Sequence, residues 1–243
     1  MRMTPQQMRE LLTPGCTADS DLLDVLEADD VDRPWVEQVA ATAHQLAASG
    51  SRLQLIACER NPRPDGECAV VFVDRSRLAA VRVGDEVSAG VAVVRSPEHG
   101  LCVMPRVFRM ICSNGAIVER DSRWQTPCEW HEVGDAMRDC LDQDLFTRSV
   151  ASFRRATTVR VADVAALAHA AGAVTDGMHL TGRAAATDPS LFGVINAATE
   201  RAHLDMRWSQ RLDRERDAAR LLAAAELSAG PRPTRSHLSI VGS

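Results

Sequence analysis

Residues 106–121, RVFRMICSNGAIVERD, combine an alternating apolar pattern with a central Asn-Gly pair. Successive side chains of a β-strand point to opposite faces, so Val107 and Phe108 are expected on opposite sides of a sheet. An Asn-Gly pair between two alternating runs is typical of a hairpin, because both central positions of a tight turn require positive φ. The stretch therefore predicts a β-hairpin that turns at Asn114 and Gly115.

The β character extends on both sides of this hairpin. Alternating or β-branched runs are separated by the turn sequences NPRPDG, VGD and SPEHG. The runs cover residues 52–58, 68–74, 86–96, 101–113 and 116–120. This arrangement predicts an antiparallel meander of about four to six strands.

Helical patterns flank the predicted sheet. Residues 33–50 follow Asp32, a possible cap, have Pro34 near the first turn and end at Gly50, which are helix start and stop signals. Apolar residues recur every four positions from Val133 through Leu145, and the stripe continues to Phe153, which predicts one helix. A second helix is expected over residues 161–172.

The last predicted helix begins with Asp188 as cap and Pro189 at the first position, and could run to about residue 229. Its polar flank is formed by Asn196, Thr199 and His203, and continues to Arg207 and Arg214. These side chains could begin a phosphate-contacting ridge, or they could satisfy buried polar partners. Farther along, Trp208 and Leu212 lie on another face, so the helix either breaks near His203 or packs on a second subunit.

The order of helices, sheet and helices predicts an α+β fold, an antiparallel β-meander flanked by N-terminal and C-terminal helices. We expect an acidic helical region over residues 1–50, an α+β core domain with C-terminal helices over 51–229, and a disordered tail over 230–243.

The composition indicates a cytoplasmic protein. Among 243 residues, no run approaches the roughly 18 apolar residues that a membrane span needs, and the N-terminus lacks the apolar core of a secretory signal. Seven cysteines, an odd number, are scattered through apolar segments, so we expect reduced thiols and no disulfide framework.

Every one of the 28 basic residues is arginine, since the chain contains no lysine. A GC-rich genome would explain this bias, and so would repeated use of guanidinium groups on phosphates or carboxylates. The net charge is −5, and the first 50 residues hold nine acids and three arginines, a balance of −6, so the remainder sums to +1. Any anion-binding surface would therefore be local.

No phosphate loop, dinucleotide fingerprint, HExxH motif or nucleophile elbow is present in the sequence. Four residues could be considered for a metal site: Cys112, Cys128, His131 and Cys140. Zinc sites usually show paired ligands at both ends of the motif, which this set lacks. A Cys112–His131 nucleophile pair is equally weakly defined. We therefore predict no metal, no cofactor and no catalytic residue.

Two stretches together resemble one family. RVFRMICSNG is similar to the R-x-x-C-[ST]-N-G signature of the phage/plasmid-like proteins grouped as domain of unknown function 932, and SLFGVINAATERAH resembles that family's later pattern. Phe192 stands where a tryptophan is common, and the acidic N-terminal region has no counterpart. The resemblance covers roughly residues 50–225 and implies a product of a mobile element. It places the signature at Arg109, Cys112, Asn114, Gly115, Asn196, Thr199, Glu200 and His203.

Our leading hypothesis is a non-enzymatic protein that forms a homo-oligomer and binds single-stranded nucleic acid, as the fold-level similarity to phage annealing proteins suggests. Trp124 and Trp130 are the nearest stacking residues. The expected contacts are Arg106, Arg109, Arg120 and Arg123 on the sheet side, and Arg207, Arg211 and Arg214 on the helix side.

Two alternatives stay open. The first is an enzyme or small-ligand protein with a pocket between the Cys112–Asn114 turn and the Asn196/His203 helix. The second is a structural or partner-binding protein.

Overall fold

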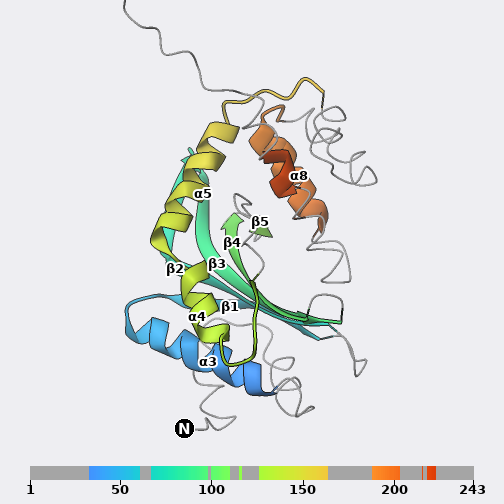
Figure 1. Ribbon diagram of the computed structural model, residues 1–243. Helices are drawn as coiled ribbons and strands as arrows, with labels where there is room; N and C mark the ends of the chain where they lie inside the picture. The colour runs from blue at the N-terminus through green and yellow to red at the C-terminus, as the bar shows by residue number, and fades with distance from the viewer. Residues whose placement is uncertain are drawn as a thin grey trace, which may run out of the picture.

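An antiparallel sheet organises the chain. The computed structural model describes residues 33–60, 67–97, 100–109, 115–116, 126–163, 188–202, 215 and 218–222. Within these ranges β1 (Leu53–Arg60), β2 (Cys68–Arg82), β3 (Asp85–Ser96) and β4 (Gly100–Arg109) pair in chain order (Figure 1). The short strands β5 (Gly115–Ala116) and β6 (Thr126–Pro127) pair with different parts of β4. The predicted antiparallel meander is confirmed.

The hairpin between β4 and β5 has a different turn from the predicted one. Phe108 pairs with Gly115 and Val107 pairs with Ala116. A two-residue turn at Asn114 and Gly115 would instead pair Ser113 with Ala116. The predicted turn is therefore wrong, because Gly115 already lies in the strand, and Asn114 itself lies outside the described residues.

The VGD sequence does form a turn. Gly84 joins β2 to β3 with φ of +76°, a conformation that side chains with a Cβ rarely adopt. Val83 beside it is fully exposed, as expected at the tip of a hairpin.

The central strands are buried on both faces. Val70 and Phe72 of β2 belong to the larger core cluster, whereas their neighbours Val71 and Val73 belong to a smaller one. On β4, Val107 and Phe108 divide in the same way between the two clusters, as the alternating pattern predicts. The sheet is thus an inner layer and not a one-sided surface.

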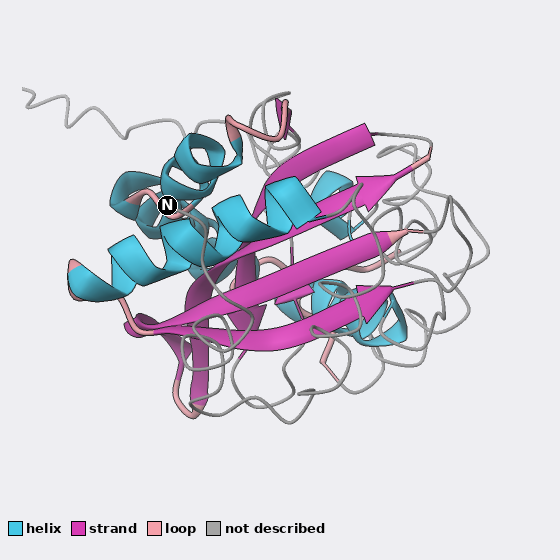
Figure 2. Ribbon diagram, turned by 90° about the horizontal axis from the view of Figure 1, so that it is seen from below, coloured by secondary structure: helices cyan, strands magenta, loops and turns pink. Residues whose placement is uncertain are grey.

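Helices cover the larger cluster. Trp35, Val36 and Val39 of α3 (Arg33–Ala48) are buried in it, which confirms the helix predicted over residues 33–50. Figure 1 shows α3 below one end of the sheet and α5 alongside β2 at the other end. Figure 2, seen from below, shows a helix in front of the strands that runs in nearly their direction. The long strands curve between these two ends (Figure 1).

Two helices replace the single one predicted over the stripe from Val133. They are α4 (Val133–Cys140) and α5 (Gln143–Ala156). The break occurs because the Asp142 side chain accepts a hydrogen bond of 2.9 Å from the backbone N–H of Leu145 and caps α5. The apolar stripe nevertheless survives the break, since Met137, Leu141 and Phe153 are all buried in one cluster.

The last described long helix, α8 (Leu191–Ala202), begins two residues after the predicted first position. Ser190 Oγ accepts a hydrogen bond of 3.1 Å from the backbone N–H of Gly193, so Ser190 is the residue that caps the helix. Asp188 in turn accepts bonds from the backbone N–H and the hydroxyl of Ser190, at 3.1 and 2.7 Å. The predicted apolar stripe is confirmed at Leu191 and Ile195, which are both buried.

These elements form the helix–sheet–helix order of an α+β fold, as predicted. None of the helices in the described ranges is long and apolar enough to cross a membrane. The segment expected to form a helix over residues 161–172 lies almost wholly outside those ranges.

Candidate functional site

Among the residues that carry the family resemblance, Arg109 has the most extensive contacts in the described part of the chain. It ends β4, and its guanidinium group donates two hydrogen bonds of 2.6 Å to the carboxylate of Asp85, one from Nε and one from Nη2. Asp85 is buried at the start of β3. Forked pairing of this kind is the strongest arrangement that an arginine and a carboxylate can make.

A second arginine extends this pair toward α8. Arg82 Nε lies 3.3 Å from Asp85 Oδ2, and Arg82 Nη1 donates a bond of 2.7 Å to Asp188 Oδ2. Both guanidinium groups also lie over the ring of Phe192, at 5.1 Å for Arg82 and 5.8 Å for Arg109. We name these five residues, Arg82, Asp85, Arg109, Asp188 and Phe192, the junction cluster.

The junction cluster joins the two stretches that carry the family resemblance. Arg109 comes from the first stretch and Phe192 from the second, and α8 also packs against β5. Phe192 is buried and meets Phe153 of α5 edge to face at 5.9 Å. Because its guanidinium group is already paired with Asp85, Arg109 serves to hold α8 on the sheet.

Electrostatics at the junction cluster favour the ionised carboxylate of Asp188. Burial alone would raise the pKa of Asp188, but the hydrogen bonds from Ser190 and the ion pair with Arg82 together lower it. The cap of α8 and the junction cluster therefore depend on the same negative charge.

Arg106 is buried, in contrast to the predicted surface role. Its side chain is 1% exposed and forms an ion pair with Glu215, whose side chain is fully buried. The guanidinium group also lies 5.2 Å from the ring of Phe108. A buried, paired arginine does not present its charge to a polyanion, so this placement corrects the expectation that Arg106 contacts nucleic acid. It anchors the chain near Glu215 to β4.

Other predicted site residues fall into two groups. Thr199 is buried, and its hydroxyl donates a bond of 3.0 Å to the carbonyl of Asn196, which is half-buried. Glu200 lies in α8 and Gly115 in β5. The remaining predicted residues lie outside the described ranges: Cys112, Asn114, Arg120, Arg123, Trp124, His203, Arg207, Arg211 and Arg214.

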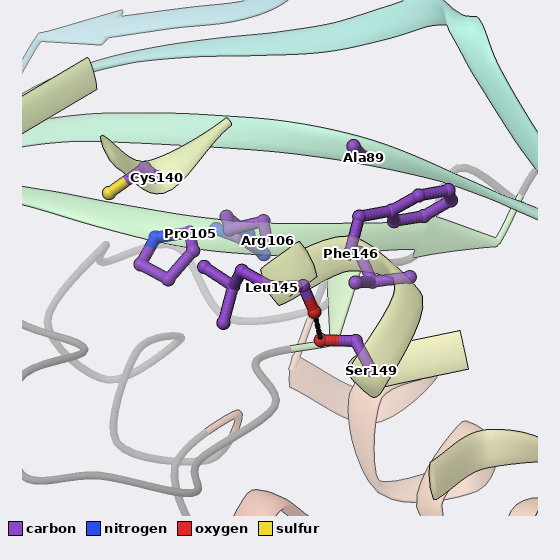
Figure 3. Close-up of a pocket in the computed structure, with 8 residues that line it drawn as sticks. Ala89, Pro105, Arg106, Cys140, Leu145, Phe146 and Ser149 are labelled. Atoms are coloured by element: carbon purple, nitrogen blue, oxygen red, sulfur yellow. Dashed lines mark hydrogen bonds between the residues drawn. The ribbon is translucent and has the colours of Figure 1, made fainter. Parts of the chain in front are cut away.

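A small hollow lies between β4 and α5. Figure 3 shows Leu145, Phe146 and Ser149 of α5 facing Pro105 and Cys140 across it, and the Ser149 hydroxyl donates a bond of 2.8 Å to the carbonyl of Leu145. Its volume of about 10 Å³ is roughly the room of one water molecule. It is too small for an organic ligand.

Cys128 and Cys140 are poor nucleophiles at neutral pH. Burial, with the nearby Cys102, Glu132 and Glu129, raises the pKa of Cys128 to about 11. Burial, Asp139 and Cys128 raise the pKa of Cys140 to about 12. Within those ranges no three histidine, cysteine or acidic side chains are grouped so that they could hold a metal ion.

Asp74 is a structural charge that the sequence analysis missed. Its side chain is fully buried where the pairing of β2 with β3 is interrupted, between Val73 and Leu78. Its Oδ1 accepts bonds from the backbone N–H of Arg52, at 3.1 Å, and from the backbone N–H and hydroxyl of Ser76, at 3.0 and 2.5 Å. Asp74 thus fixes the irregularity at which β2 separates from β1.

Beyond this irregularity, β2 and α5 carry a group of exposed arginines. The segments 75–84 and 145–162 contain seven arginines and no acidic residue. They lie against each other, since α5 packs on β2 and Arg154 Nε donates a bond of 2.9 Å to the carbonyl of Ala80. Six of these arginines are exposed, and one of them, Arg82, belongs to the junction cluster. We name the other five the arginine surface: Arg75, Arg148, Arg154, Arg155 and Arg160.

Three hydrogen bonds donated by the arginine surface have uncharged acceptors, one of them the bond from Arg154 to Ala80. Arg75 Nε donates to Gln54 Oε1 at 2.8 Å, and Arg155 Nη2 donates to the Ser152 hydroxyl at 2.9 Å. Within the described part of the chain, Arg148 and Arg160 form no ion pair with a carboxylate. The absence of acidic residues from the two segments could have been read from the sequence. That the two segments pack against each other is known only from the fold.

No family model matches the chain, and no curated protein or solved structure matches it either. The resemblance to the phage/plasmid-like family therefore stays a prediction.

Proposed function

We propose that the protein is a non-enzymatic, self-assembling protein of mobile-element type that binds single-stranded nucleic acid through the arginine surface. The observation that carries this proposal is that α5 packs on β2 and so brings together two segments that contain no acidic residue and carry exposed arginines. Phosphate neutralisation supplies most of the affinity in binding of this kind. The arginines of the junction cluster and Arg106 hold the fold together instead.

The arginine surface is better suited to single-stranded nucleic acid than to the groove of a duplex. Arg148 and Arg155 are seven residues apart on α5, so they lie on nearly the same helix face, about 10 Å apart along the axis. The helix that carries them packs on β2, and Leu78 of that strand is 49% exposed. Guanidinium planes and exposed apolar side chains can both contact unstacked bases.

Fluorescence anisotropy with a labelled oligothymidylate tests the proposal. We expect binding that weakens steeply with salt, and an affinity at low salt about tenfold lower in the Arg148→Ala, Arg155→Ala variant. The slope of log affinity against log salt should fall by about 0.7 for each phosphate contact removed. An unlabelled duplex of equal length should displace the labelled oligothymidylate only poorly.

Arg138→Ala is the control for single replacements at the arginine surface. Arg138 lies on α4, is 43% exposed and is paired with Asp135 at 2.5 Å, so its loss also removes one exposed positive charge. We expect it to bind nearly as tightly as the wild type. Absence of wild-type binding at low salt would end the proposal, and equal loss in Arg138→Ala and Arg148→Ala would show that the named surface is not the site.

Self-assembly rests on the sequence pattern at Trp208 and Leu212, which lie outside the described residues. Light scattering of a Trp208→Glu, Leu212→Glu variant tests it. A folded variant with the mass of the wild-type assembly would count against this part of the proposal.

The pocket alternative is favoured by one observation, which is that α8 packs against β5. The elements that would line such a pocket are therefore neighbours. A rise in melting temperature on adding a small ligand, lost in Asn196→Ala, would support this alternative over nucleic-acid binding.

A further inference from the structure

The charge of the described chain changes sign between α4 and α5. Residues 129–144 contain six acidic residues, all exposed, and one arginine, Arg138, which pairs with Asp135 at 2.5 Å. Residues 145–162 follow directly and contain four arginines and no acidic residue. Five exposed residues of α4 and the turn before it form what we name the acidic surface: Glu129, Trp130, Glu132, Asp135 and Asp139. One chain therefore carries two exposed surfaces of opposite charge.

The two surfaces lie at different ends of the described fold. α4 packs on α3, whereas α5 leads away from them alongside β2 (Figure 1). The 14 residues of α5 span about 20 Å, which is about twice the Debye length at physiological salt. The acids of α4 therefore do not neutralise Arg154 and Arg160, which lie toward the far end of α5 and beyond it.

Both surfaces coincide with exposed apolar side chains. The large apolar side chains that are exposed in the described part of the chain are Leu78, Val83 and Trp130. Trp130 is 50% exposed in the acidic surface, and Leu78 is 49% exposed on β2, the strand on which α5 packs. Tryptophan is enriched among the residues that contribute most to protein–protein binding. Opposite charge combined with apolar exposure favours a protein interface at each surface.

We propose that the acidic surface of one copy docks on the arginine surface of a second copy, so that copies associate head to tail. In this contact the carboxylates of Glu132 and Asp139 pair with guanidinium groups, and the ring face of Trp130 stacks on a guanidinium plane. A contact between two different surfaces leaves one of each at the ends, so it grows into a ring or a filament. The proposal rests on the self-assembly part of the proposed function, but it requires neither nucleic acid nor the contact at Trp208 and Leu212.

Charge identifies the occupant of the acidic surface. The carboxylates on both sides of Trp130 repel a phosphate chain and attract guanidinium groups. The chain itself supplies these groups at high density, since residues 75–84 and 145–162 contain seven arginines and no acidic residue. A second copy is therefore the complementary partner.

The test reverses the charge of each surface in a separate full-length protein. The acid-reversed variant is Glu129→Arg, Asp139→Arg, and the base-reversed variant is Arg148→Glu, Arg160→Glu. All four side chains are exposed, and circular dichroism compares the folding of the variants with that of the wild type. The two variants shift the net charge in opposite directions, so a general effect of net charge cannot weaken association in both.

Sedimentation velocity at low salt measures association. We expect the mass of the wild type to rise with protein concentration and to fall when salt is added. Each variant alone should associate more weakly by about tenfold or more, because like charges then face each other. An equimolar mixture should form a complex with one copy of each variant, because the acidic surface of the base-reversed copy meets the arginine surface of the acid-reversed copy. Misfolded variants could not form this mixed complex.

The position of Trp130 provides a matched control within the mixed complex. Trp130→Ala should weaken the complex by about tenfold when it is placed in the base-reversed copy, whose acidic surface is used. The same change should have little effect in the acid-reversed copy, whose acidic surface is not used. Equal effects in the two copies, no complex on mixing, or wild-type association by either variant alone would overturn the proposal.

The oligothymidylate separates this contact from nucleic-acid binding. Both use the arginine surface, so a bound oligonucleotide should dissolve the mixed complex. Binding of the oligonucleotide to a complex that stays intact would overturn the arginine surface as the docking site. A mixed complex from proteins that bind no oligonucleotide would support the contact and remove nucleic-acid binding. Oligonucleotide binding without any mixed complex would do the reverse.

Discussion

Arg109 and Asp85 are bound side chain to side chain through two hydrogen bonds of 2.6 Å, which tie the end of β4 to the start of β3. The Arg109 guanidinium also lies over the ring of Phe192 of α8, so the same side chain contacts both the sheet and the helix. Arg109, which begins the first stretch that resembles the family, therefore has a structural role that is visible in its contacts.

Breaking this pair should destabilise the fold. Asp85→Ala leaves the Arg109 guanidinium without its bidentate acceptor in a largely buried place, and we expect a loss of about 2–4 kcal/mol in the free energy of unfolding. Arg109→Lys should cost less but still measurably, because an ammonium group cannot reproduce the fork. Urea denaturation of the two single variants and the double variant gives the coupling energy, and a coupling near zero would contradict the assignment.

Gly193→Ala should destabilise α8, although alanine is normally favoured over glycine in helices by about 1 kcal/mol. A Cβ at residue 193 would overlap the carbonyl oxygen and side chain of Asp188, which holds the cap. We expect a loss of about 1–3 kcal/mol, measured by thermal or urea unfolding. Gly50→Ala is a useful comparison, because a Cβ there meets no atom within 4 Å and any cost comes only from its φ of +99°. A stabilised Gly193→Ala protein would disprove the close approach.

The contribution of Asp188 should depend on pH. Its pKa is lowered in the folded protein from the ordinary 3.8, so its stabilising effect is fully present above that value and is lost as the pH falls through the folded pKa. Asp188→Ala should therefore be less stable than the wild type by about 1–2 kcal/mol at pH 7. The two proteins should converge in acid below pH 3.8, and a difference that stays constant to low pH would contradict the ionic role.

Cys128 and Cys140 should react slowly with iodoacetamide. A thiol with a pKa of about 11 is ionised to roughly one part in a thousand at pH 8, and the value of about 12 for Cys140 lowers that fraction further. Mass spectrometry after timed alkylation of the native protein measures the two rates. Labelling of Cys128 as fast as a free cysteine would show that its thiol is less buried than described.

Most of the fold followed from local patterns, and the exceptions have physical causes. The turn at Gly84 and the stripe from Val133 to Phe153 were predictable, because φ preference and periodicity are properties of short segments. The register of β4 and β5 was not, since a wider connection lets Phe108 pair with Gly115 and overrides the local Asn-Gly signal. The helix break at Asp142 was not predicted, because the apolar spacing continues unchanged across the residue that caps α5.

Less of the candidate site could be predicted, because it depends on partners distant in the sequence. Arg106 and Arg109 look alike along the strand, yet the first is paired with Glu215 and the second with Asp85. Nothing in residues 106–121 indicates either partner. The arginine surface depends likewise on α5 packing against β2, which only the fold determines.

The two halves of β2 should differ in hydrogen exchange. Residues 68–74 lie between β1 and β3, whereas residues beyond Arg75 pair with β3 alone among the described strands. Amides of the first half should exchange only when the whole domain unfolds, and those near Leu78 and Ala80 should exchange through smaller openings. Such an opening would separate Arg82 from Asp188 and loosen α8 together with the hairpin tip. We therefore expect the β2–β3 tip and the start of α8 to open as one cooperative unit, although more than a hundred residues of chain lie between them.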